Sequence, residues 1–151
     1  MNAPFRILAA AVCGLLLGLT AAQARDNPIF QFINLGTAED ELTVHPHELM
    51  LQVGETYQLV VSNPSKQIHV VAAPGLEAAV NTSRLTIGGA RLNVPAPALD
   101  MFTGITLQPG QVIEWTFTPL NEGVYKFGCD DPAHAAAGMH TMIEVVTQEV
   151  L

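Results

Sequence analysis

Short segments of alternating apolar and polar residues, separated by glycine and proline turns, constrain the fold of this chain most strongly. Such alternation is typical of β-strands that bury one face, and the sequence contains no long amphipathic helical pattern. About seven strands at this spacing predict an all-β protein, an antiparallel β-sandwich built as one domain. The expected strands cover residues 42–44, 49–53, 57–61, 68–71, 104–107, 112–117, 124–129 and 139–146.

Two stretches lack this alternation. We expect residues 26–40 to form an irregular lead into the first strand. Between residues 76 and 100 we expect a helical turn over 77–80. A hairpin of 84–87 with 91–94 should follow across Gly88-Gly89, because a Gly-Gly pair suits a tight turn. Beyond it, two prolines, Pro95 and Pro97, favour extended coil.

The first residues have the pattern of an export signal. Arg6 precedes an apolar run over 7–19, and Ala22-Gln23-Ala24 forms a small-x-small cleavage site. The run is shorter than the roughly 20 residues that span a bilayer. We therefore expect a signal peptide over 1–24, a lead segment over 25–41 and one domain over 42–151. The exported protein would be periplasmic and without a membrane span.

Charge and cysteine content narrow the possible partners and chemistry. The net charge of -8 argues against nucleic acid as a partner, because nucleic-acid sites carry basic patches. Loss of the signal would remove Cys13 and leave Cys129 as the only thiol. A lone thiol in an oxidising compartment is oxidised or mispaired unless a metal or deep burial protects it.

Cys129 begins a run of three potential metal ligands at C-x4-H-x4-M spacing, followed by His134 and Met139. A thiolate, imidazoles and a weak axial thioether are the donors that copper uses when it cycles between Cu(I) and Cu(II). A second imidazole must come from elsewhere. His69 is the best candidate of the five histidines, because it stands where a loop enters a strand. A partly buried histidine bonded to backbone is the alternative reading.

The same residues resemble the cupredoxins, the blue copper proteins. The likeness runs from about residue 42 to 146, and the Cys-to-His-to-Met separations are most similar to those of rusticyanin- and auracyanin-type members. The resembling segments are Gly123 to Cys129, Pro132 to His134, Gly138 to Val145, and Asn63-Pro64 through His69.

This resemblance implies a Greek-key β-sandwich with one type 1 copper per chain. His69, Cys129 and His134 would be the equatorial ligands, Met139 would be the axial ligand, and electrons would pass through the edge of His134. We expect a monomer that exchanges electrons with redox proteins of the periplasm or respiratory chain. Small apolar residues around His134 would exclude water and admit a partner: Ala133, Ala135, Ala136 and Ala137.

Two features depart from the cupredoxin pattern. Cupredoxins commonly have asparagine or another polar residue directly after the first histidine, where its side chain helps to tie the ligand loops together. Here that residue is Val70, so we expect this side-chain link to be lost. The segment over 76–100 has no assigned match. Trp115 and Phe117 are expected in the core.

The same residues do not suit a catalytic site, so we do not expect an enzyme. No glycine-rich nucleophile turn precedes Cys129, as a thiol hydrolase would require. Structural zinc usually takes several thiolates, and only one exists here. A binuclear copper centre needs a second loop cysteine. A multicopper oxidase needs histidines on both sides of the cysteine, where this chain has Gly128 and Asp130.

Two non-catalytic alternatives remain. A copper-handling protein, for sequestration, tolerance or delivery of copper, would use the same ligands. His45, His47 and His140 favour this alternative, because two histidines two apart on a strand share a face and can bind a second metal. His140 should point away from Met139. A copper-free interaction domain is disfavoured because no ligand is missing.

Overall fold

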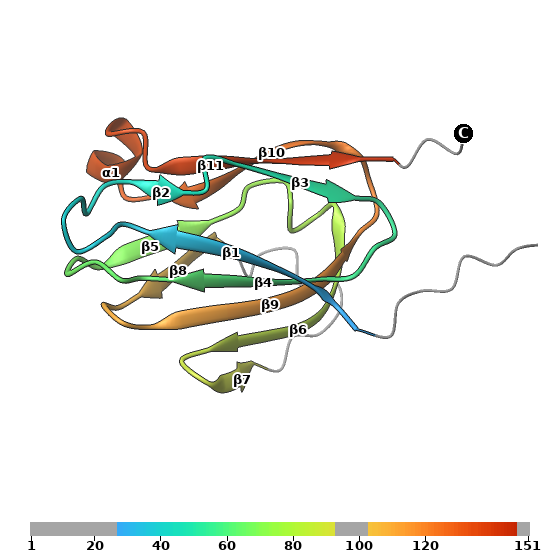
Figure 1. The fold of residues 1–151 in the computed structure, drawn as a ribbon, viewed down its shortest axis with the longest axis horizontal. Helices are drawn as coiled ribbons and strands as arrows, with labels where there is room; N and C mark the ends of the chain where they lie inside the picture. Colours follow the sequence, from blue (N-terminus) through green and yellow to red (C-terminus); the bar gives the residue numbers. More distant parts are fainter. Residues whose placement is uncertain (1–26, 93–102, 148–151) are drawn as a thin grey trace, which may run out of the picture.

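The computed structural model describes residues 27–92 and 103–147, which fold into two β-sheets packed face to face (Figure 1). The first sheet contains, in spatial order, β2 (Val44–His45), β1 (Ile29–Leu35), β4 (Tyr57–Ser62), β9 (Val112–Pro119), β6 (Val80–Ile87) and β7 (Ala90–Leu92). The second contains β3 (Glu48–Gln52), β11 (His140–Val146), β10 (Gly123–Cys129), β5 (His69–Ala72) and β8 (Thr103–Leu107). Among the described residues, the one helix is α1 (Pro132–Ala136), between β10 and β11.

The predicted all-β Greek-key sandwich is confirmed, with one correction to strand direction. Most neighbouring strands are antiparallel, but β1 runs parallel to β4 and β3 runs parallel to β11, so both sheets are mixed. The two parallel pairs arise because the chain crosses from the first sheet to the second between β2 and β3. β2 pairs with β1 in the first sheet, and β3 then joins the second sheet beside β11.

The expectation of an irregular lead over 26–40 is wrong, because β1 occupies residues 29–35 and pairs with β4 over most of its length. Ile33 and Leu35 of β1 are fully buried, whereas Phe30 and Phe32 are more than half exposed. Apolar residues on both faces of a strand remove the polar alternation that would identify it. The strand expected over 42–44 is observed at residues 44–45, as β2.

The region after residue 76 agrees in part with the predictions. The hairpin across Gly88-Gly89 is confirmed, with Ile87 opposite Ala90, but its first strand already begins at Val80. A turn over residues 74–78 replaces the helical turn expected at 77–80. Pro95, Pro97 and the signal peptide expected over 1–24 lie outside the described residues. Within the described ranges, no helix has the length and apolar character needed to cross a membrane.

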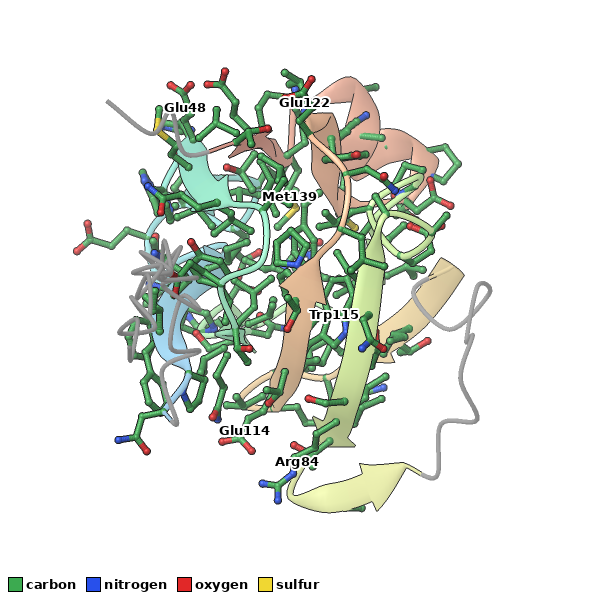
Figure 2. The ribbon with its side chains drawn as sticks, turned by 90° about the vertical axis from the view of Figure 1, so that its right-hand side faces the viewer. Glu48, Arg84, Glu114, Trp115, Glu122 and Met139 are labelled. Carbon is green, nitrogen blue, oxygen red and sulfur yellow. The ribbon has the colours of Figure 1, made fainter. Side chains whose placement is uncertain are left out.

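The core lies between the two sheets. The two aromatic residues that we expected in the core, on β9, are buried in it. Trp115 (labelled in Figure 2) lies on β9 and is almost completely buried. Phe117, on the same face of β9, is also fully buried, and the two ring centroids are 4.3 Å apart. On β10, Phe127 and Cys129 face the same interior. The core therefore continues from the middle of the sandwich to the end that carries α1.

Candidate metal centre

Three of the four predicted ligands converge at this end of the sandwich. His69 begins β5, Cys129 ends the neighbouring strand β10, and His134 lies in α1. Their ligand atoms all lie within 4.8 Å of one another. The Nδ1 atom of His134 is 3.3 Å from His69 Nδ1 and 3.4 Å from Cys129 Sγ. His69 and Cys129 are buried, and His134 is partly exposed.

The position of His134 is set by the start of α1. Asp131 is the N-cap residue, and its Oδ1 accepts hydrogen bonds from the backbone N–H groups of Ala133 (2.9 Å) and His134 (3.2 Å). Pro132 follows at the first helical position, where its missing N–H costs nothing. Our sequence reasoning missed this helix. The Asp-Pro pair was the signal that could have revealed it.

Met139 is fully buried just before β11, and its backbone is bonded to both loop ligands. Its carbonyl accepts from Cys129 N–H at 3.0 Å, and its N–H donates to the His134 carbonyl at 3.1 Å. Figure 2 places Met139 in the half of the molecule that carries α1. The loop thus holds Met139 next to Cys129 and His134. Its role as axial ligand stays a prediction.

Backbone hydrogen bonds connect the two ligand segments where we expected a side-chain link to be lost. The N–H of Val70 donates to Cys129 Sγ at 3.4 Å, and the N–H of Asp130 donates to the Val70 carbonyl at 2.7 Å. Neither bond depends on the side chain at position 70. The valine therefore does not separate the ligand segments.

Burial lowers the pKa of His69 below its usual value of 6.5, and the nearby His134 lowers it further. The carboxylates of Glu41 and Asp131 act in the opposite direction but do not reverse the shift. A lowered pKa keeps the imidazole neutral at pH 7. This is the protonation state that a metal ligand requires.

The donor set fits copper. Donors bound to one first-row metal at about 2 Å in a trigonal plane lie about 3.5 Å apart, and the separations of 3.3 and 3.4 Å are close to this value. One cysteine sulfur and two imidazoles, with a buried methionine on the same loop, match a His2Cys copper site better than a thiolate-rich zinc site.

The remaining histidines lie outside this cluster. His45 and His47 are both exposed, with ring centroids 4.9 Å apart. His140 is partly buried, whereas its neighbour Met139 is fully buried, which agrees with the predicted opposite orientation. Across the described ranges, the one group of three or more His, Cys, Asp or Glu side chains suited to a metal is that of His69, Cys129 and His134.

A family model described as copper binding proteins of the plastocyanin/azurin family matches residues 30–146. The chain belongs to this family. The predicted cupredoxin resemblance is thereby confirmed, and so is copper as the cofactor. A sequence search against curated proteins returned no significant match.

Solved structures with the same fold include small copper proteins and domains of larger oxidases. Auracyanin B shares 18% identity and a TM-score of 0.53, over 82% of this chain and 93% of that one. Auracyanin A from *Chloroflexus aurantiacus*, described as a "blue" copper protein, shares 21% identity and a TM-score of 0.52, over 80% and 100%.

A multicopper oxidase from *Campylobacter jejuni* shares 14% identity and a TM-score of 0.57, over 86% of this chain. The chain spans about a third of the length of such oxidases, since it covers 32% of this one. At these identities the likeness concerns the fold.

Proposed function

We propose that this cupredoxin is a periplasmic electron carrier with one type 1 copper, held by His69, Cys129, His134 and Met139. The observation that carries the proposal is the convergence of one cysteine sulfur and two imidazole nitrogens within 4.8 Å, on a loop that also carries a buried methionine. Bound copper supplies one-electron chemistry by alternating between Cu(I) and Cu(II). The protein holds the donors in place and excludes water.

The partner surface would lie around His134. This histidine is partly exposed, Ala133, Ala136 and Ala137 beside it are exposed, and Ile68 before the first ligand is 50% exposed. A small apolar surface lets a redox protein approach the imidazole edge closely. The negative net charge favours partners with a basic surface.

The residues that flank the cysteine also support a carrier rather than an oxidase. Gly128 and Asp130 stand where an oxidase domain would have histidines that connect the type 1 copper to further copper ions. These two residues therefore offer no such connection to further copper ions. We therefore propose that the protein accepts and donates single electrons, a role for which a monomer is sufficient.

The test is the absorption and EPR spectrum of the copper-loaded protein. The wild type should show an intense thiolate-to-copper band in the visible range. Cys129→Ser should abolish the band, whereas the control His47→Gln, which changes an exposed histidine, should retain it. A Cys129→Ser protein that keeps the band would disprove the assignment.

A copper-handling role is the second candidate function, and the adjacency of His45 and His47 favours it. Two exposed imidazoles with ring centroids 4.9 Å apart can chelate one Cu(II) ion. Metal analysis would then find a second copper that the double variant His45→Gln/His47→Gln loses. One copper per chain in both proteins, with respiration impaired on deletion, would favour the carrier instead.

A further inference from the structure

The second ring nitrogen of His69 has a buried partner in the loop before β5. Its Nε2 atom lies 2.9 Å from Ser65 Oγ, and both residues are almost completely inaccessible to solvent. The other nitrogen, Nδ1, faces His134. Only one nitrogen of a neutral imidazole carries a hydrogen, so the bond at Nε2 decides whether Nδ1 is free to bind a metal.

The direction of the bonds follows from Asn63, which is 1% exposed. Its amino group donates to two backbone carbonyls, those of Gln67 (2.8 Å) and Leu107 (3.0 Å). Carbonyls only accept, so the amide orientation is fixed and Asn63 Oδ1 must face Ser65. That oxygen accepts from the Ser65 N–H at 3.1 Å and from the Ser65 hydroxyl at 2.7 Å.

The hydrogen-bonding capacity of Ser65 is then fully used. A hydroxyl has one hydrogen and two lone pairs. The hydrogen goes to Asn63 Oδ1 at 2.7 Å, which is much nearer than the other acceptor, the Gln67 carbonyl at 3.4 Å, and one lone pair accepts from the Gln67 N–H at 3.2 Å. The remaining lone pair meets His69 Nε2, which must therefore carry the hydrogen. The lone pair of Nδ1 is consequently directed toward Cys129 and His134.

We propose that Ser65 and Asn63 are positioning residues that hold His69 in the Nε2–H tautomer and present its Nδ1 to copper. Asn63 also bonds to the carbonyl of Leu107, which is the register partner of His69 on β8. The ligand is thereby fixed by buried bonds to its own loop and to the adjacent strand. This inference rests on His69 being a copper ligand, as proposed above.

Imidazole ¹⁵N NMR of the copper-free and Cu(I) forms reads the tautomer of His69 directly. The wild type should show hydrogen on Nε2 in both forms. Ser65→Ala should reduce this preference in the copper-free form and weaken copper affinity by about 10–100-fold, as is common when the partner of a ligating histidine is removed. Ser62→Ala is the matched control, because it removes a neighbouring hydroxyl that bonds Asn34 on β1.

Hydrogen on Nδ1 in the copper-free wild type would overturn the proposal without any variant. It would also be overturned by a folded Ser65→Ala protein with unchanged tautomer and copper affinity. Failure of the proposed function is distinguishable, because it appears as a missing thiolate-to-copper band in the wild type. The tautomer of the copper-free protein is read independently of that band.

Discussion

Gly128 lies on β10 opposite His140 of β11, next to the ligand Cys129, and replacing it with alanine should disturb both folding and copper ligation. A Cβ atom at this position would lie 2.7 Å from His140 Cα and 2.8 Å from His140 Cβ, and it would also contact the Met139 carbonyl oxygen. Gly128 and His140 are register partners in the sheet. The added methyl therefore meets the backbone of the paired strand, which cannot rotate away.

The geometry gives the size of the effect. Ordinary contacts begin near 3.4 Å, so the strands must separate by about 0.7 Å. This displacement would extend the 3.0 Å bond from Cys129 N–H to the Met139 carbonyl beyond useful range. Overpacking costs about 1–3 kcal/mol and a lost hydrogen bond about 1 kcal/mol. Reduced freedom of the unfolded chain offsets up to about 1 kcal/mol. The free energy of unfolding should fall by about 1–4 kcal/mol.

Urea unfolding of the copper-free protein measures this loss, and the absorption spectrum of the copper-loaded protein reports the displaced Met139. Gly54→Ala is the control. Gly54 has a positive φ of 84° and nothing within 4 Å of an added Cβ, so alanine there should cost about 1–2 kcal/mol from backbone conformation alone. Its copper spectrum should not change. A Gly128→Ala protein with wild-type stability and spectrum would refute the steric argument.

Three further perturbations test the site and its scaffold. Because the pKa of His69 is lowered in the folded state, the unfolded chain binds more protons below pH 6.5; copper-free stability should therefore fall as pH drops from 6.5 toward the folded pKa. Urea titrations at several pH values should show this slope, and His69→Gln should reduce it. Tyr57→Phe removes the hydroxyl that accepts from Gln52 N–H at 2.9 Å, so unfolding measurements should show a loss of about 1–2 kcal/mol; an unchanged value would mean that water replaces the hydroxyl. Met139→Leu should retain the thiolate band but raise the reduction potential, as read by redox titration, because a donor to Cu(II) is lost; an unchanged potential would contradict axial ligation.

Strands with one polar face could be predicted from the sequence, and strands without one could not. β9 and β11 alternate regularly between buried and partly exposed residues, and both were found. β1 was missed because Phe30 and Phe32 make its outer face apolar as well. In β6 only the second half was recognised. Its pairing with β9 shifts register between Thr82 and Arg84, and such a shift interrupts the alternation of faces.

For the metal centre, sequence spacing was informative about ligands that are close in the chain. Cys129 and Met139 flank one loop and His134 lies within it, so their order in the sequence was sufficient to place them together. His69 could be chosen among five histidines because it starts a strand. The role of Ser65 could not be predicted, because it depends on an amide orientation set partly by a carbonyl on β8, 44 positions from Asn63.

The connection between the ligand segments shows why a missing polar side chain need not loosen a buried site. At position 70 the contacts to Cys129 and Asp130 are made by backbone N–H and carbonyl groups, which every residue except proline offers in full. These contacts form because β5 and β10 are paired immediately beside the ligands, with Cys129 opposite Val71. Sheet pairing therefore fixes the distance between His69 and Cys129, and the N-cap of α1 fixes the third donor. Ligands held in this way by backbone geometry suit the proposed one-electron exchange, because a fixed donor set limits the rearrangement that a change of oxidation state would require.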